Sequence, residues 1–208
     1  MPAHRVFLLS PASCGGKRAA LLFNDRAAFS LAVRLRSAEG ATLGEVFSFL
    51  SGLYFRGKLA YAMEFARPPR RAPGAAIITT SRGLMPPSAP IGIDDLRDFA
   101  AVPIDASEPR YAEPLARDAR ALMKAIGAKT EVVLLGSVAS DKYVGVLGEI
   151  FGSRLLFPTE FVGRGDMSRG GLMLRCVREE RELDYTPVVG ATRRGARPPR
   201  LVPVKALR

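Results

Sequence analysis

The pattern of apolar and polar positions divides the chain into short continuous apolar runs and longer stretches with helical periodicity. A run of about four to eight apolar residues bounded by turn residues is typical of a strand that is buried on both faces of a parallel sheet. Such runs predict four strands, at residues 5–10, 75–80, 131–135 and 154–157. Between these runs, apolar residues recur at roughly every third or fourth position, as on the buried face of a helix.

The predicted helices are delimited by common start and stop residues. Thr42 is followed three residues later by Glu45, a capping box that predicts the beginning of a helix. Ser140 is placed to cap another helix, and Gly127 is placed to end one. The predicted helices span residues 25–36, 42–53, 59–66, 113–126 and 141–150, with one or two further turns within 91–105.

The last third of the chain is expected to complete the sheet. Residues 171–177 predict a fifth strand, and residues 182–189 predict an edge strand, because Pro187 cannot donate a hydrogen bond to a neighbouring strand. Strands that alternate with helices predict an α/β fold, three-layered with a mostly parallel central sheet. We expect a single domain at residues 1–191, followed by a basic, extended tail at residues 192–208.

The stretch at residues 157–175 is the strongest candidate for a binding loop, because its centre is polar and rich in glycine. Glycine lets a backbone turn tightly and approach a ligand, and arginine offers forked donors to phosphate or carboxylate. We therefore expect a ligand-binding loop between two buried strands. A solvated turn in which Asp166 pairs with Arg164 or Arg169 has the same composition, and this alternative stays open. The glycines are Gly163, Gly165, Gly170 and Gly171, and the polar candidates are Glu160, Arg164, Asp166, Ser168 and Arg169.

Further candidates follow the other predicted strands. In open α/β sheets the loops at the carboxyl ends of the strands line the ligand crevice, so residues 11–18, 81–87 and 158–171 are expected to share one rim. The first loop has the composition of an anion cradle, although Pro11 and Arg18 replace the first glycine and the Ser/Thr of a Walker A loop. Cys14 is either a nucleophile or a packed small residue. The predicted substrate- or phosphate-binding residues of the strand-end loops are Ser13, Gly15, Gly16, Lys17, Ser81, Arg82 and Ser137.

A cluster of basic and aromatic residues lies in the predicted helices between the first two strands. Aromatic rings among cations can stack on bases and hold phosphates, but such rings more often belong to the core. Both interpretations stay open for Tyr54, Phe55, Arg56, Lys58 and Tyr61.

The charge balance favours a polyanionic partner. Lys and Arg number 31 against 20 Asp and Glu, a net charge of +11, so we expect nucleic acid, DNA above all, or a nucleotide as partner. GC-rich codon usage, which raises Arg, Ala, Gly and Pro together, produces the same excess.

Several classes of protein are excluded or disfavoured by composition. No apolar run approaches the ~20 residues that span a membrane. Two cysteines and one histidine do not form a structural zinc site without carboxylates, and we expect neither a metal nor a cofactor. The few cysteines and the lack of a secretory signal predict a cytoplasmic protein.

Short motifs within residues 6–91 resemble a known family. The sequence Leu-Leu-Ser-Pro-Ala at residues 8–12 resembles the opening of the peroxide-stress YaaA family. Ser13-Cys14 with Lys17 resembles the opening of a related group of uncharacterised phage and bacterial proteins. Leu53-Tyr54 with Gly57 is similar to a helix of that group, and residues 77–84, followed by Pro86-Pro87, are similar to its next strand and loop.

The resemblance implies an α/β protein that contacts DNA or modified nucleobases, more distantly similar to the core of uracil-DNA glycosylases and archaeosine synthase. We therefore expect an enzyme that acts on a base or nucleotide, at a glycosidic C–N bond or by base modification. A non-catalytic DNA-binding stress protein and a nucleotide or anion sensor are the alternatives. In the enzyme, Asp166 or Glu160 would supply a carboxylate, Ser13, Lys17, Ser81 and Arg82 would hold the base or phosphate, and Arg164 and Arg169 would grip the backbone.

Overall fold

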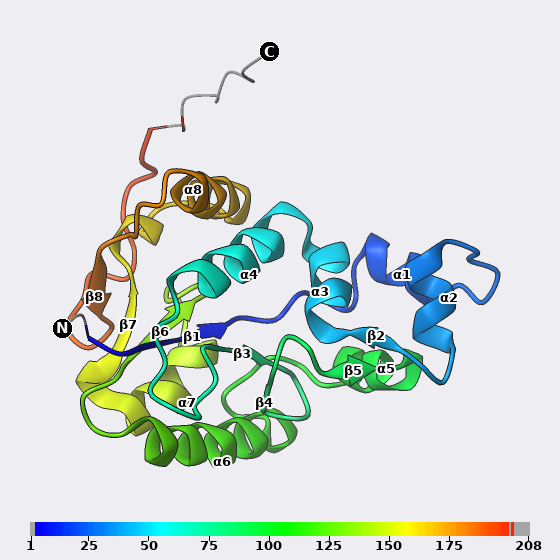
Figure 1. Ribbon diagram of the computed structural model, residues 1–208, viewed down its shortest axis with the longest axis horizontal. Helices are drawn as coiled ribbons and strands as arrows, with labels where there is room; N and C mark the ends of the chain where they lie inside the picture. The colour runs from blue at the N-terminus through cyan, green and yellow to red at the C-terminus, as the bar shows by residue number, and fades with distance from the viewer. Residues whose placement is uncertain (1–2, 200, 202–208) are drawn as a thin grey trace.

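The fold is built on a six-stranded sheet with the strand order β4-β3-β1-β6-β7-β8. Figure 1 shows the computed structural model, which describes residues 3–199 and 201. The four central strands are parallel, and the two short edge strands run antiparallel to their neighbours. The strands are β1 (Arg5–Leu9), β3 (Ala75–Ile78), β4 (Leu84–Met85), β6 (Glu131–Leu135), β7 (Leu155–Pro158) and β8 (Tyr185–Pro187).

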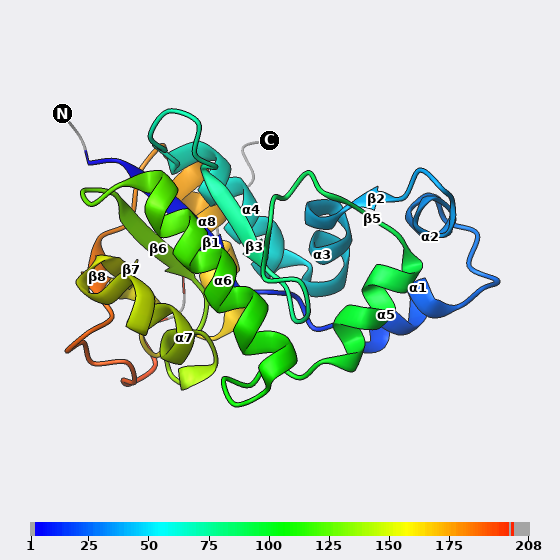
Figure 2. The same ribbon diagram turned by 90° about the horizontal axis from the view of Figure 1, so that it is seen from below.

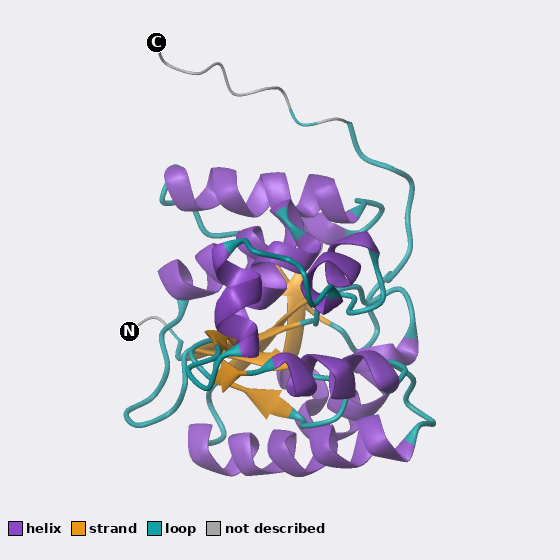
Figure 3. Cartoon of the chain, turned by 90° about the vertical axis from the view of Figure 1, so that its right-hand side faces the viewer, coloured by secondary structure: helices purple, strands orange, loops and turns teal. Residues whose placement is uncertain are grey.

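Helices cover both faces of this sheet, which confirms the predicted three-layer α/β architecture. α4 (Leu53–Phe65) and α8 (Asp166–Arg178) lie on one face. α6 (Pro109–Ile126) and α7 (Asp141–Phe151) lie on the other, as the view from below shows (Figure 2). Seen from the side, the strands form a middle layer between the two sets of helices (Figure 3).

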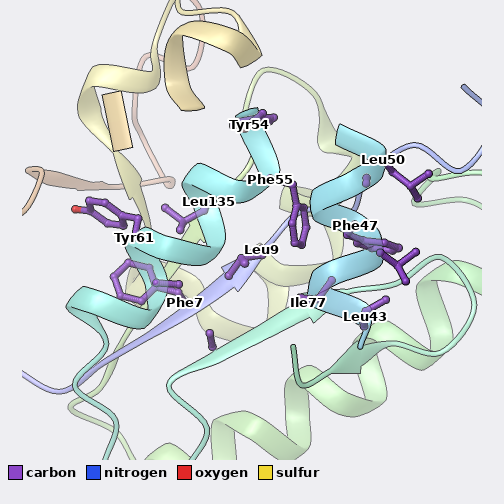
Figure 4. Close-up of a cluster of buried hydrophobic side chains, with 14 of the residues drawn as sticks. Phe7, Leu9, Leu43, Phe47, Leu50, Tyr54, Phe55, Tyr61, Ile77 and Leu135 are labelled. Carbon is purple, nitrogen blue, oxygen red and sulfur yellow. The ribbon is translucent and has the colours of Figure 1, made fainter. Parts of the chain in front are cut away.

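β1 lies in the middle of the sheet and supplies both hydrophobic cores. Phe7 and Leu9 pack into the cluster beneath α3 (Leu43–Ser51), α4 and α8, whereas Val6 and Leu8 pack into the cluster beneath α6 and α7. This alternation is the period of two that a strand imposes on its side chains. Figure 4 shows the first cluster, in which side chains from β1, β3 and β6 meet aromatic rings of α3 and α4.

The remaining elements lie beyond the carboxyl ends of the central strands, at the right of Figure 1. This part of the chain places a helical wall next to the sheet edge at which α/β proteins bind ligands. Its elements are α1 (Lys17–Phe23), α2 (Ser30–Arg36), α3 (Leu43–Ser51), α5 (Ile93–Ala101) and a two-stranded sheet of β2 (Ala41–Thr42) with β5 (Pro90–Ile91). Two 3-10 turns, Gly152–Arg154 and Thr159–Phe161, flank β7.

The predicted strand at residues 171–177 is wrong, because these residues belong to α8. The short run around Leu172 and Met173 fits a strand and a helix equally well on its apolar pattern alone. In the helix, Leu172, Met173 and Cys176 share a buried face that packs on α4. The expected loop at residues 158–171 is correspondingly short, since the helix begins at Asp166.

The glycines of this stretch serve helix packing and turning. A Cβ atom on Gly170 would lie 2.7 Å from the carbonyl oxygen of Leu53, and one on Gly57 would lie 2.7 Å from the carbonyl oxygen of Gly170. The backbones of α4 and α8 therefore touch at a pair of glycines. Gly163 has a φ of +74° and lies against the carbonyl of Ala196, so it is a turn residue.

The predicted helix at residues 25–36 is also corrected, because only its second half is helical, as α2, which begins at Ser30. Residues 24–29 form a turn after α1, a helix that was not predicted. The side chain of Asn24 accepts a hydrogen bond from the backbone N–H of Arg26 at 3.0 Å. Such a local bond competes with helical bonding and forms a turn. Lys17 is the first residue of α1 and thus lies in a helix rather than in the predicted loop.

The C-terminal region matches the prediction in part. β8 lies within the predicted residues 182–189, contains Pro187, and is the last strand in the sheet, which makes it an edge strand. Residues 192–199 form neither helix nor strand. Arg193 forms an ion pair with Asp141 at 2.8 Å, so the start of the predicted tail lies against α7. Arg200, Lys205 and Arg208 of the tail lie outside the described residues.

Where the chain is described, the helices include none that is both long enough and apolar enough to cross a bilayer.

The glycine contact predicts that Gly170→Ala will separate α4 from α8 and lower the free energy of unfolding by about 1–3 kcal/mol, as overpacking does. Gly171→Ala is the matched control in the same helix, because its Cβ would meet only a side-chain carbon at 3.7 Å. Because alanine has a higher helix propensity than glycine, Gly171→Ala should have the stability of wild type or be about 0.5–1 kcal/mol more stable. Urea unfolding measures both, and equal stability of the two variants would contradict the contact.

Candidate functional site

A cleft of about 610 Å³ opens at the carboxyl ends of β1, β3 and β6. The expectation that residues 11–18, 81–87 and 158–171 share one rim is met in part, because residues 11–15 and Asp166 line the cleft whereas no residue of 81–87 does. The cleft is lined by residues 10–15 after β1, Thr80 after β3, Ser137 after β6, and Asp166 at the start of α8, together with Leu50, Ser51, Tyr54, Phe99, Ala100, Val102, Ile104, Lys142 and Tyr143.

Five of the predicted site residues meet in this cleft. Three come from the loop after β1, one follows β6, and Asp166 is the first residue of α8. Segments far apart in the sequence therefore line one cleft, whose lining includes a carboxylate and hydroxyl groups. The five are Ser13, Cys14, Gly15, Ser137 and Asp166.

The other predicted residues do not line the cleft. Arg82 forms ion pairs with Asp95 at 2.5 Å and Asp98 at 3.3 Å, and thereby holds the start of α5. Arg164 donates to the hydroxyl of Ser168 at 3.3 Å, and both line a separate hollow of about 310 Å³ beside Arg197. The remaining residues outside the cleft are Gly16, Lys17, Ser81, Glu160 and Arg169.

Thr80, rather than Ser81, reaches the cleft at the end of β3. Successive side chains of an extended chain point to opposite sides, so a shift of one residue changes the exposed group. The Thr80 hydroxyl donates to the carbonyl of Phe99 at 2.7 Å and fixes α5 to the strand end. The Ser81 hydroxyl is buried and meets no hydrogen-bonding atom of the described chain.

Arg169 positions Asp166 and the preceding turn. Its guanidinium is buried, donates to the carbonyl of Phe161 at 2.9 and 3.2 Å, and stacks on the Phe161 ring at 5.3 Å. It lies 3.6 Å from the carboxylate of Asp166. The pairing of Asp166 with Arg169 that the sequence left open is therefore present, and a buried guanidinium is not placed to grip a nucleic-acid backbone.

Cys14 has the surroundings of a packed small residue. Its thiol is buried and donates to the carbonyl of Ala12 at 3.7 Å. Burial raises the pKa of Cys14 to about 12, so the thiolate that a nucleophile requires is scarce at neutral pH. Cys176 is also buried and free. These surroundings favour the packing alternative for Cys14 over the nucleophile.

Sequence analysis missed the contact between Ser10 and Lys58. Lys58 is fully buried, and its ammonium group lies 2.5 Å from the carbonyl oxygen of Ser10 and 2.9 Å from the Ser10 hydroxyl. The same nitrogen lies 4.4 Å from the ring centre of Tyr54 and 4.7 Å from that of Phe55. Burial lowers the pKa of Lys58 to about 7, although the charge of Asp166 acts in the opposite direction. The basic-aromatic cluster in the sequence was the one signal of this site.

Two tyrosines supply buried hydroxyl groups to the cleft. The Tyr54 hydroxyl is buried and forms no well-aligned hydrogen bond among residues 3–199 and 201, although the side chains of Arg169 and Ser10 lie close enough to act on its pKa. Burial raises the pKa of Tyr54 to about 12 and raises that of Tyr143 as well. Both phenols therefore stay protonated at neutral pH and can donate to a ligand.

Comparisons of the chain with protein-family models, with curated proteins and with solved structures returned no match.

The buried amine predicts a pH-dependent stability. In the unfolded chain the pKa of Lys58 returns to about 10.4, so above pH ~7 the unfolded chain binds more protons than the folded chain. Stability then rises with pH. Between pH 7 and about 8.5, wild type should gain about 1–2 kcal/mol of unfolding free energy relative to Lys58→Met.

Urea unfolding at both pH values measures this difference. The other titrating groups, including Cys14, are common to both proteins and leave the difference unchanged. Parallel pH dependence in the two proteins would show that Lys58 keeps its ordinary pKa.

Proposed function

We propose that the protein is an enzyme that acts on a nucleobase or nucleotide bound in this cleft. The observation that carries the proposal is the meeting, at one strand-end cleft, of Asp166 and a buried Tyr54 hydroxyl that forms no well-aligned hydrogen bond within the described residues. A buried polar group without a partner is costly, and a ligand that pairs with it regains the lost hydrogen bond. The cleft volume of about 610 Å³ lies in the range of small-molecule sites.

The lining suits a base in particular. The aromatic residues Tyr54, Phe99 and Tyr143 are among those that line the cleft, and base-binding pockets combine aromatic stacking with hydrogen bonds to the edge of the base. Hydroxyls of Ser13 and Ser137 add donors and acceptors. The lysine at position 142 is exposed at the cleft, where its ammonium can bind a phosphate.

Asp166 is the residue assigned to the chemistry. Its carboxylate is 68% exposed at the cleft and is oriented from behind by Arg169. In glycosidic C–N cleavage such a carboxylate stabilises positive charge on the sugar or accepts a proton from attacking water. The likeness of residues 8–17 to the YaaA family and to its phage and bacterial relatives supports a nucleobase or nucleic-acid substrate.

The proposal predicts separate effects of two substitutions on activity toward nucleosides, nucleotides and base-modified DNA. Asp166→Asn should lower kcat about 10²–10⁴-fold with ligand affinity largely retained, because it removes proton transfer but keeps the size of the side chain. Tyr54→Phe should weaken binding about tenfold, the value of one hydrogen bond to a buried group.

Product analysis by chromatography and ligand binding by calorimetry measure the two effects. Glu149→Gln, an exposed carboxylate on α7 outside the cleft, controls for the loss of a surface charge. Turnover that survives Asp166→Asn unchanged would remove Asp166 from the chemistry.

A non-catalytic DNA-binding protein is the second candidate, favoured by the net charge of +11. If binding relies on phosphate contacts alone, the logarithm of the association constant falls linearly with the logarithm of the salt concentration. The slope is about −1 for each phosphate contact.

Fluorescence anisotropy with labelled duplex and single-stranded DNA at two salt concentrations measures this slope. Salt-dependent, sequence-tolerant binding that Asp166→Asn leaves unchanged, with no product from any nucleotide substrate, would establish the second candidate. A lack of binding at low salt would exclude it.

A further inference from the structure

The Ser10–Lys58 pair joins the end of the central strand to the middle of α4. Ser10 follows β1 directly and is one of the residues that line the cleft. The amine of Lys58 touches that hydroxyl at 2.9 Å and the Ser10 carbonyl at 2.5 Å. The function proposed above makes no use of this pair, although a serine in contact with a lysine is one of the known nucleophile–base arrangements of hydrolases.

The position of the Ser10 hydroxyl is fixed by backbone contacts. The backbone N–H of Ser10 donates to the carbonyl of Leu135 at 3.2 Å, which continues the pairing of β1 with β6. On the other side, a Cβ atom on Gly136 would lie 3.1 Å from the hydroxyl oxygen. The glycine therefore lets the next loop approach Ser10 closely, and the serine is held between that loop and Lys58.

The surroundings of Lys58 favour the loss of its proton. Aromatic rings of Tyr54 and Phe55 flank the amine on α4, and Asp166 and Arg169 act on it with opposite signs from α8. Tyr143 reaches the Ser10 side of the pair from α7. Burial lowers the pKa of Lys58 to about 7, so a large fraction of the amine is neutral at neutral pH and carries a free electron pair.

We propose that Ser10 is a nucleophile and that Lys58 is its general base, for substrates with an electrophilic carbonyl carbon. The substrate class is an ester or amide that fits the cleft, including an acyl group carried by a nucleotide. The pair is defined by the protein's own atoms, and this inference stands whether or not the substrate is a nucleotide.

The reaction balances without a cofactor. The Ser10 oxygen forms a bond to the carbonyl carbon while its proton passes to the neutral amine of Lys58. The bond from that carbon to the leaving group breaks, and the leaving group takes the proton from the Lys58 ammonium. Water then attacks the acyl-serine, with Lys58 again accepting and returning one proton, and releases the acid.

The opposite arrangement is a permanently charged Lys58 that only pins the end of β1. In that case the ammonium donates to both Ser10 oxygens and the serine has no base. Both arrangements fit a nitrogen 2.9 Å from the hydroxyl, but only a neutral amine increases the reactivity of the serine as the pH rises.

The test is modification by phenylmethanesulfonyl fluoride, an electrophile that reacts with activated serine hydroxyls; Ser10 lines the cleft and is 4% exposed. The Ser10 oxygen would bond to sulfur, fluoride would leave, and Lys58 would take the proton. Intact-mass and peptide mass spectrometry should show one addition, at Ser10, with a rate that rises between pH 6 and 8 about a midpoint near 7. No addition at Ser10, or a rate without this midpoint, would overturn the proposal.

Variants separate the nucleophile from the base. Ser10→Ala should abolish the addition, and Lys58→Met should slow it at least about 10²-fold, the usual contribution of a general base. Ser51→Ala is the matched control, because Ser51 lines the same cleft and no hydrogen bond joins it to Lys58 in the described part of the chain.

A folded Lys58→Met protein that reacts as fast as wild type would refute the role of the base. If that variant does not fold, the pH profile of the wild-type protein decides. Since the reagent is not a nucleotide, failure of this test leaves the nucleotide proposal untouched, and success does not establish it.

Discussion

The backbone contact between α4 and α8 is the constraint on which the site depends. At Gly57 and Gly170 neither helix has room for a side chain, so the two helices approach more closely than larger residues permit. This approach brings Tyr54 and Lys58 of α4 next to Asp166 and Arg169 of α8. The electrostatic effect of Asp166 and Arg169 on Lys58 thus depends on an uncharged contact between two glycines.

The parallel sheet supplies the second half of the arrangement. β1 lies between β3 and β6 and is followed directly by Ser10, and residues of α3 and α5 line the same cleft. A strand that is buried on both faces cannot carry polar groups along its length, so its polar groups are concentrated at its end. In this protein the end of β1 carries a serine with a buried lysine behind it.

The sequence predicted the parts of the fold that depend on local pattern. The four apolar runs became the four parallel strands, and Thr42 accepts the hydrogen bond from the Glu45 N–H that the capping box predicts. The run at 171–177 was misassigned because its neighbours on the helical face, Arg169 and Gly170, look like loop residues until α4 covers them. Glycines that serve a helix contact have the same sequence signature as glycines that serve a ligand.

The candidate site was predicted in part for a similar reason. Convergence of Ser13, Ser137 and Asp166 follows from the rule for strand ends, whereas the pairing of Ser10 with Lys58 joins residues 48 positions apart and no local pattern encodes it. The burial of a charged residue such as Lys58 is visible only once the surrounding helices are placed.

Cys176 is fully buried in α8, on the face that α4 covers. A thiol in that position reacts with a sulfhydryl reagent only after the two helices have parted. The native chain thus contains a reporter of its own opening, because the rate at which Cys176 is alkylated depends on how often this helix pair separates.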